Sequence, residues 1–243
     1  MVSFDGMPTV HDSSRGKVVT FELALETVRR LARLRSSGVQ VSANHTIISR
    51  ASMADHQPLV EQLQGLGVET QWVLAYSESS MYAVQRRGRR ADDLVLAQGY
   101  PLHPDLDWDE ARAFVDAKCK SARSIEDPAL RLGKQYYAEG LASRLAKDSE
   151  QSGRVNAPRP KCVALRSHLR LLPDGGVPVC QFNTEVVGNL TEQSLDEVWE
   201  GAHATRARAW VDRCEGCWAE CEVIPNALYS GDLVRYATSR WLA

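Results

Sequence analysis

The sequence predicts an α/β fold, in which three parallel strands with helices are followed by a helical connector and a small α+β domain with a β-hairpin. Strand and helix patterns alternate over the first 76 residues, helical patterns fill 107–147, and five of the six cysteines fall between 162 and 221. Alternating strands and helices are typical of a parallel sheet. We therefore expect units at 1–105, 106–160 and 161–226 and a tail at 227–243.

The N-terminal third begins with a short apolar strand at Val2–Phe4, which ends at Asp5-Gly6. The polar stretch 9–17 is predicted to be a loop. A helix is predicted next, because apolar residues recur at helical spacing until Gly38 ends the pattern. Its buried positions are Phe21, Leu25, Val28 and Leu31.

Two more strands continue the alternation. Residues 39–48 contain alternating apolar side chains, and residues 68–76 are rich in β-forming residues. Between them, Ser52 and Asp55 have the spacing of a capping box. The helix that they would begin buries Leu59, Leu63 and Leu66.

Three parallel strands form an incomplete unit. They cannot close a barrel, and a parallel sheet needs its faces and edges covered. The first strand also begins one residue after Met1. We therefore interpret this region as the middle of a larger α/β unit, whose other part is missing or lies on another chain, and we expect the isolated chain to be poorly soluble.

Two helices are predicted in the connector, at 107–122 around Trp108 and Phe114, and at 128–147. Cys119 on the first helix is interpreted as a small apolar residue rather than a ligand. Lys and Arg total 29 and Asp and Glu total 31, so the overall charge favours neither nucleic acid nor a membrane surface.

The cysteines are interpreted as metal ligands. No apolar run approaches the roughly 20 residues of a membrane span, and no secretory signal is visible, so we expect a cytoplasmic protein. Thiols stay reduced in the cytoplasm, which disfavours disulfides. The candidate ligands are Cys162, Cys180, Cys214, Cys217 and Cys221.

The spacing of these cysteines suggests how they meet. A hairpin of strands 169–172 and 177–179, joined by the turn Pro173–Gly176, would return Cys180 to the vicinity of Cys162. The Cys-x-x-Cys segment at 214–217 directs two sulfurs at one metal centre, and Cys221 lies one helical turn further on. Spacing alone leaves zinc and an iron–sulfur cluster both open.

The cysteine region resembles the SPASM domain, or the shorter twitch domain, of radical S-adenosylmethionine enzymes. The matching features are Cys162, Gly175, Cys180, Gly188-Asn189-Leu190, Ser194 to Trp199, Arg206 or Arg208, Cys214 and Cys217. The resemblance implies one auxiliary 4Fe–4S cluster, because the two-cluster form of the domain has seven cysteines. It makes these four cysteines the first-choice ligands, with Cys221 as a substitute or a free thiol.

The N-terminal strands resemble the fourth to sixth strands of the radical S-adenosylmethionine barrel. The resemblance rests on Val2 to Gly6, His11-Asp12, Arg15-Gly16, Phe21 and the strands that follow. It implies that Ser3 and Asn44 contact S-adenosylmethionine, with Arg15 as a weaker candidate. It also puts Asp5 at the C-terminal rim of the barrel, where active sites form.

The chain departs from this family in one respect. It has no Cys-x-x-x-Cys-x-x-Cys motif, which in the family holds the cluster that cleaves S-adenosylmethionine. We therefore expect this chain to be the C-terminal part of a radical enzyme that acts on a peptide or a small metabolite. We expect it to be inactive alone. A separate chain would supply the N-terminal half barrel, and S-adenosylmethionine would bind only when that half is present. Two alternatives stay open: an iron–sulfur module for binding or electron transfer on a partner chain, and a structural zinc protein.

Overall fold

The computed structural model describes residues 1–76, 102–145, 158, 160–183, 185–214 and 218–241, without the side chains of Arg35, Glu220, Cys221 and Trp241. The chain divides into two compact units. The first contains the described residues up to Tyr76 together with Leu102–Ala111, and the second contains the described residues from Arg112 onward. Each unit is treated by itself.

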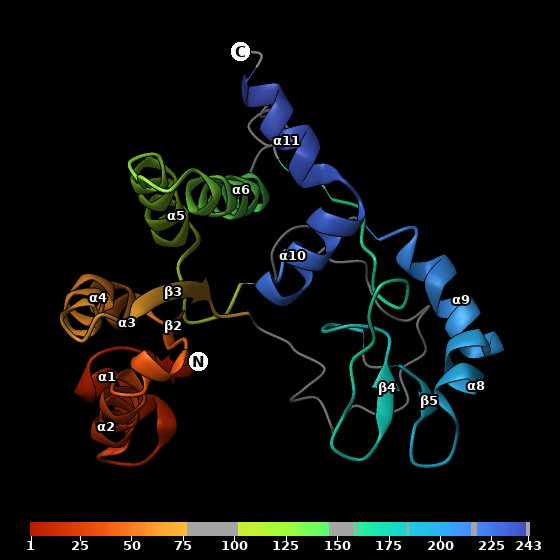
Figure 1. The fold of residues 1–243 in the computed structure, drawn as a ribbon, viewed down its shortest axis with the longest axis horizontal. Helices are drawn as coiled ribbons and strands as arrows, with labels where there is room; N and C mark the ends of the chain where they lie inside the picture. Colours follow the sequence, from red (N-terminus) through yellow and green to blue (C-terminus); the bar gives the residue numbers. More distant parts are fainter. Residues whose placement is uncertain (77–101, 146–157, 159, 184, 215–217, 242–243) are drawn as a thin grey trace. The chain divides into compact units, whose positions relative to one another are not determined.

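A parallel sheet lies at the centre of the first unit (Figure 1). Its strands β1 (Val2–Phe4), β2 (Ser42–Ile47) and β3 (Glu69–Leu74) lie in the order β1-β2-β3, and both pairs are parallel. The predicted three-stranded parallel sheet is therefore confirmed. The register puts Ser3 beside Asn44 and Asn44 beside Gln71, so these three polar side chains share one face of the sheet.

Helices cover the opposite face of this sheet. Helix α2 (Thr20–Ala32) packs on β1, and α4 (His56–Gly65) packs on β2 and β3. The helix α3 (Arg50–Ala54) and the 3-10 helix η1 (Arg35–Ser37) complete the connections. The core between sheet and helices consists of Phe4, Phe21, Leu25, Val28, Ala43, Leu59, Leu63 and Val68.

The loop predicted at 9–17 is wrong, because helix α1 (Pro8–Arg15) occupies it. Pro8 stands at the first helical position, where its missing N–H leaves no bond unmade, and Gly16 ends the helix with a φ of 64°. The polar side chains serve the next helix instead. Asp12 accepts hydrogen bonds from the main-chain N–H groups of Val19 and Phe21, both at 2.8 Å.

The predicted capping box at Ser52 and Asp55 is also wrong. Ser49 caps α3, since its hydroxyl accepts the N–H of Ser52 at 3.2 Å. The Ser52 hydroxyl donates instead to the main-chain oxygen of Asp5 at 2.5 Å, and the Asp55 carboxylate accepts the N–H of Met7 at 2.8 Å. Both side chains thus hold the turn after β1, a long-range role that spacing does not reveal.

Both predicted connector helices are present, as α5 (Trp108–Ala122) and α6 (Pro128–Arg144). Cys119 is buried on α5. In the second unit, α6 packs against α11 (Asp232–Trp241), where the Tyr136 hydroxyl donates to Asp232 at 2.7 Å and the Tyr136 and Tyr236 rings meet edge to face at 5.2 Å. Helix α10 (Glu220–Tyr229) precedes α11.

The cysteine-bearing part contains an antiparallel pair, β4 (Gly176–Pro178) and β5 (Val186–Asn189), with α8 (Leu195–Glu200) and α9 (Ala202–Val211) against it (Figure 1). The predicted strand partner is wrong, because β4 pairs with β5 and not with residues 169–172. The turn before β4 is nevertheless formed, since the N–H of Leu172 donates to the oxygen of Gly176 at 2.8 Å.

Two glycines of this part are required by their surroundings. Gly175 has a φ of 82°, in the left-handed region that favours glycine. A Cβ on Gly188 would lie 2.7 Å from Cγ2 of Val198, so α8 packs directly on the backbone of β5. Ser194 and Glu197 form a capping box that begins α8. The glycine and serine positions of the motif are thus explained by packing and capping.

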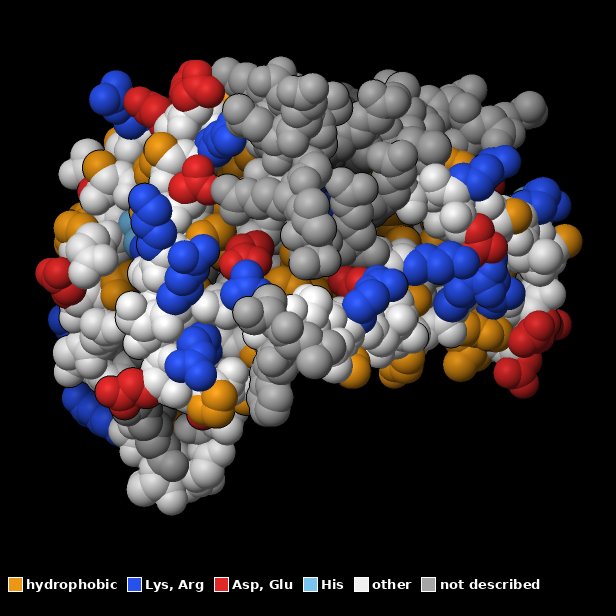
Figure 2. Space-filling model, turned by 90° about the horizontal axis from the view of Figure 1, so that it is seen from above, with side chains coloured by type: hydrophobic (Ala, Val, Ile, Leu, Met, Phe, Trp, Pro, Cys, Tyr) orange, Lys and Arg blue, Asp and Glu red, His pale blue; other side chains and the backbone are white. Residues whose placement is uncertain are grey.

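The described surface mixes charges of both signs. On the face in Figure 2, lysine and arginine side chains lie among acidic and hydrophobic ones, which agrees with the formal net charge of −2. Among the helices that the structure describes, none combines the length and the apolar character needed to cross a bilayer.

Candidate metal centre

Three of the five candidate cysteines gather in one core of the second unit. Cys162 is buried, and Cys180 and Cys214 are half-buried against the same cluster. Cys217 lies outside the described residues, and of Cys221 the structure describes only its place in α10. The cluster is completed by side chains from β4, β5, α8 and α9, among them Val177, Val187, Val198, Ala204 and Val211.

The three thiols share one electrostatic neighbourhood. Burial raises the pKa of Cys162 to about 11, and the charge of Cys214 adds to the rise. Burial likewise raises the pKa of Cys180 to about 12, with a contribution from the charge of Cys162. Without a metal, the Cys162 and Cys180 thiols hold their protons at neutral pH, so a metal that binds them must displace protons.

Nitrogen donors surround the sulfur atoms. The main-chain N–H of Asn183 donates to Sγ of Cys180 at 3.3 Å, and the main chain of Phe182 also lowers the pKa of Cys180. The main chain of Ala164 and the side chain of Asn226 lower the pKa of Cys162 in the same way. Such donors stabilise the thiolate form that ligates a metal.

The donor set fits a thiolate-bound metal. All the candidate ligand atoms are cysteine sulfurs, which suit zinc or an iron–sulfur cluster. In the part of the chain with described side chains, no three His, Cys, Asp or Glu residues stand at the spacing of a preformed metal site. The side chains of Cys217 and Cys221, two of the five candidate ligands, lie outside that part.

A buried carboxylate lies next to the thiols. Glu222 is 2% exposed, and its charge raises the pKa of both Cys162 and Cys180. His168 Nε2 lies 3.0 Å from its Oε2, and Arg170 Nε donates to Oε1 at 2.9 Å. Burial alone would raise the pKa of Glu222, but these two partners hold it below its ordinary value. No local pattern reveals this group, because Glu222 lies more than 50 positions from both His168 and Arg170.

Helix α9 holds the segment that follows Cys162. Arg208 on α9 donates from Nε to the main-chain oxygen of Leu165 at 2.7 Å and from Nη2 to that of Trp199 at 2.6 Å. Its guanidinium also stacks 4.7 Å from the centre of the Trp199 ring. Leu165 has a φ of 56°, which is uncommon for a residue with a side chain and needs such support. Of the two arginines in the motif, Arg208 thus has an evident structural role.

Two of the candidate residues of the first unit, Ser3 and Asn44, lie within the strands β1 and β2. Ser3 and Asn44 are neighbours across β1 and β2, on the face away from α2 and α4. Arg15 lies at the end of α1 and forms an ion pair with Asp5, with Nε 2.6 Å from Oδ2. The sheet therefore brings Ser3 and Asn44 together, whereas the guanidinium of Arg15 is engaged by Asp5.

Three buried histidines that are not among the predicted site residues also lie in this unit. His45 and His56 are buried and stacked, with their Nδ1 atoms 2.9 Å apart, and Ser52 Oγ lies 3.3 Å from Nε2 of His45. His11 is buried as well, and its Nδ1 accepts the N–H of Asp5 at 3.0 Å. Isolated histidines carry no helical or strand periodicity, so only the fold reveals these contacts.

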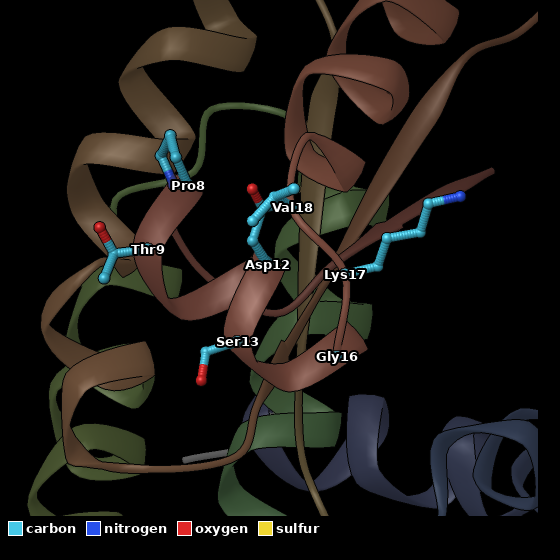
Figure 3. A pocket seen from close by; sticks show the side chains of 7 residues that line it. All are labelled: Pro8, Thr9, Asp12, Ser13, Gly16, Lys17 and Val18. Carbon is cyan, nitrogen blue, oxygen red and sulfur yellow. The ribbon is translucent and has the colours of Figure 1, made fainter.

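An open hollow lies over α1 (Figure 3). Pro8, Thr9, Asp12, Ser13, Gly16, Lys17 and Val18 line it. The Asp12 carboxylate is already engaged by the start of α2, and the Lys17 side chain extends away from the other labelled residues. This hollow contains none of the predicted site residues and offers no evident chemistry.

Comparison with known families supports the metal interpretation. Residues 162–218 match the SPASM family, described as an iron–sulfur cluster-binding domain. No curated protein and no solved structure matches the chain. The matched segment contains Cys162, Cys180, Cys214 and Cys217 and ends before Cys221. It supports an iron–sulfur domain of the kind found in radical S-adenosylmethionine proteins.

Proposed function

We propose that the C-terminal unit binds one auxiliary 4Fe–4S cluster through Cys162, Cys180, Cys214 and Cys217. The observation that carries the proposal is the match over residues 162–218, which contains these four cysteines. The gathering of three of the thiols in one core, two of them with neighbours that affect their pKa, supports it further. Cys221 is the substitute ligand.

The bound cluster would hold substrate or pass electrons from a radical product. The protein's own residues partly bury the sulfurs and donate hydrogen bonds to them, and both effects tune a cluster's potential. The substrate class that we propose is a peptide or a small metabolite.

For the first unit we propose a contribution to a site for S-adenosylmethionine. Ser3 and Asn44, side by side on the face away from the helices, are the proposed contacts, and Arg15 is the third candidate. Cleavage of S-adenosylmethionine needs a Cys-x-x-x-Cys-x-x-Cys segment, which the six cysteines of this chain do not form. The proposed partner is therefore a separate chain with the N-terminal half barrel.

A second candidate rests on the cluster-binding segment alone, which is the part of the chain that matches a known family. In this alternative the chain is an iron–sulfur module that docks on a partner chain for binding or electron transfer, without radical chemistry. Mixing the loaded chain with S-adenosylmethionine and a half-barrel partner that carries the motif separates the two candidates. Cleavage that depends on both chains supports the first, and electron exchange without cleavage supports the second.

Anaerobic reconstitution of the full chain tests the cluster. We expect about four iron and four sulfide per chain, whereas stoichiometric zinc without sulfide would establish the structural zinc alternative. Cys180→Ala should abolish the visible absorbance of the loaded chain. Cys119→Ala is the matched control, because Cys119 is a buried cysteine on α5 outside the matched segment, and it should keep the cluster.

A further inference from the structure

Two buried asparagines lie beside the cysteines, and a main-chain N–H fixes the amide oxygen of each. The N–H of Glu185 donates to Oδ1 of Asn183 at 3.0 Å, and the N–H of Val163 donates to Oδ1 of Asn226 at 2.8 Å. The two side chains are almost fully buried, at 1% and 5% exposed. Because an amide has one acceptor end and one donor end, fixing Oδ1 also fixes the direction of the NH₂ group.

Asn226 illustrates what this arrangement does. Its side chain lowers the pKa of the Cys162 thiol, against the larger effect of burial. Since Val163 already occupies the amide oxygen, the amide nitrogen is the end that serves the sulfur. A buried asparagine held by its oxygen thus becomes a donor to a ligand sulfur.

Asn183 has the same anchor and an unused donor. Its Nδ2 is buried and has no hydrogen-bond partner among the described residues. Its main-chain N–H lies 3.3 Å from Sγ of Cys180, and its main-chain oxygen accepts the N–H of Cys180 at 3.3 Å. The unused donor is therefore within a side-chain length of the thiol. Native proteins rarely leave a buried amide NH₂ group without a partner.

We infer that Asn183 donates a hydrogen bond from Nδ2 to a sulfur of the cluster that Cys180 ligates, and thereby raises the reduction potential of that cluster. The inference rests on the proposed function, because it needs a cluster at Cys180. Reduction adds negative charge that is shared by the sulfur atoms, and an N–H donor stabilises the more negative state. Asn183 is thus a positioning and tuning residue and does not take part in bond making.

The surroundings explain why such a donor matters. The Glu222 carboxylate is buried and acts on both Cys162 and Cys180, so it disfavours added negative charge at the sulfurs. Arg170 and His168 contact the Glu222 carboxylate and offset part of its charge there. The amide donors of Asn183 and Asn226 act at the sulfurs themselves.

The test uses the full chain, reconstituted anaerobically, in a redox titration followed by electron paramagnetic resonance. Asn183→Asp keeps an acceptor for the N–H of Glu185 but removes the donor, and Asn183→Leu removes it without adding charge. Both variants should retain the iron and sulfide content of the unmodified chain and should have a lower reduction potential. The matched control is Asn189→Asp, where Asp174 and Thr191 already engage the amide, and its potential should not change.

A second readout identifies the bond itself. Electron–nuclear double resonance of the reduced cluster in heavy water should reveal exchangeable protons close to the sulfurs, and one coupling should disappear in both variants. If the loaded variants keep the original reduction potential and all couplings, the inference about Asn183 is overturned, but the proposed cluster is not. If the unmodified chain takes up no iron and sulfide, the proposed function itself fails.

If the variants do not hold a cluster, isotope labelling of the unmodified chain provides the test instead. The unmodified chain is then loaded after incorporation of asparagine with ¹⁵N in its side chain. Two coupled side-chain nitrogens, from Asn183 and Asn226, support the inference. The absence of any coupled side-chain nitrogen overturns it.

Discussion

The indole ring of Trp218 fills the space that a side chain at Gly140 would need. A Cβ on Gly140 would lie 1.8 Å from Cζ2 of Trp218, and Nε1 of Trp218 donates to the main-chain oxygen of Tyr137 at 2.8 Å. Trp218 has a φ of 59° and directly follows Cys217 in the sequence. Helix α6 therefore holds the chain where the Cys-x-x-Cys segment ends.

Gly140→Ala should disturb this contact. The added methyl group cannot fit without moving the indole, and overpacking of this kind costs about 1–3 kcal/mol. We expect a lower midpoint of unfolding and less iron per chain after reconstitution, measured by denaturant titration and metal analysis. Gly133→Ala on the same helix is the control, because a Cβ there meets nothing within 4 Å. The control should gain up to about 1 kcal/mol from helix propensity; equal behaviour of the two variants would count against the contact.

Gly188→Ala should weaken the packing of α8 on β5. The new Cβ would lie 2.7 Å and 2.9 Å from the two Cγ atoms of Val198, and we expect a cost of about 1–3 kcal/mol. The double variant with Val198→Ala provides the control, since the smaller side chain leaves room for the methyl group. Denaturant titration of the four proteins in this cycle should reveal a favourable coupling. Simple additivity would mean that the two residues do not compete for the same space.

Arg15→Gln should destabilise the turn after β1. The Asp5 side chain is 5% exposed and Arg15 is its cation, so the variant leaves a buried carboxylate without that partner. We expect the free energy of unfolding to fall by about 1–3 kcal/mol. The loss should lie towards the lower end of this range, because Arg15 itself is 45% exposed. Adding Asp5→Asn should restore part of the lost stability, measured by thermal unfolding of the full chain. If the double variant is no more stable than Arg15→Gln alone, the ion pair is not the cause.

The first unit should lose stability in mild acid because of His11. Burial lowers the pKa of His11 below 6.5, since its Nδ1 accepts the N–H of Asp5 in a buried site. The unfolded chain then binds more protons than the folded one, so stability falls as the pH drops below about 6.5 towards the folded pKa. One group contributes at most about 1.4 kcal/mol per pH unit.

Hydrogen exchange measures this effect in the first unit. Amides of β1 and α2 should open more easily at pH 5.5 than at pH 7.5, after correction for the intrinsic exchange rate. His11→Gln should flatten this pH dependence, because it removes the titrating ring. An unchanged slope in the variant would assign the effect to other groups.

Much of the fold follows from local patterns. Short apolar strands and the helical spacing of Phe21, Leu25 and Val28 predict the parallel sheet and its helices, because these patterns repeat with the period of the structure that they form. Errors arise where a polar residue bonds across the fold. Ser52 and Asp55 match a local cap, yet they bind the distant turn at Asp5 and Met7.

The sequence by itself determined a cysteine-rich segment that matches an iron–sulfur cluster-binding family, because cysteines and turn glycines at fixed spacing are a local pattern of the chain. Only the tertiary structure decided which side chains surround the thiols. Asn226 lies 63 positions from Val163, and Tyr137 lies 81 positions from Trp218. Contacts at such separations depend on how helices and strands pack against one another, and no local pattern in the chain encodes them.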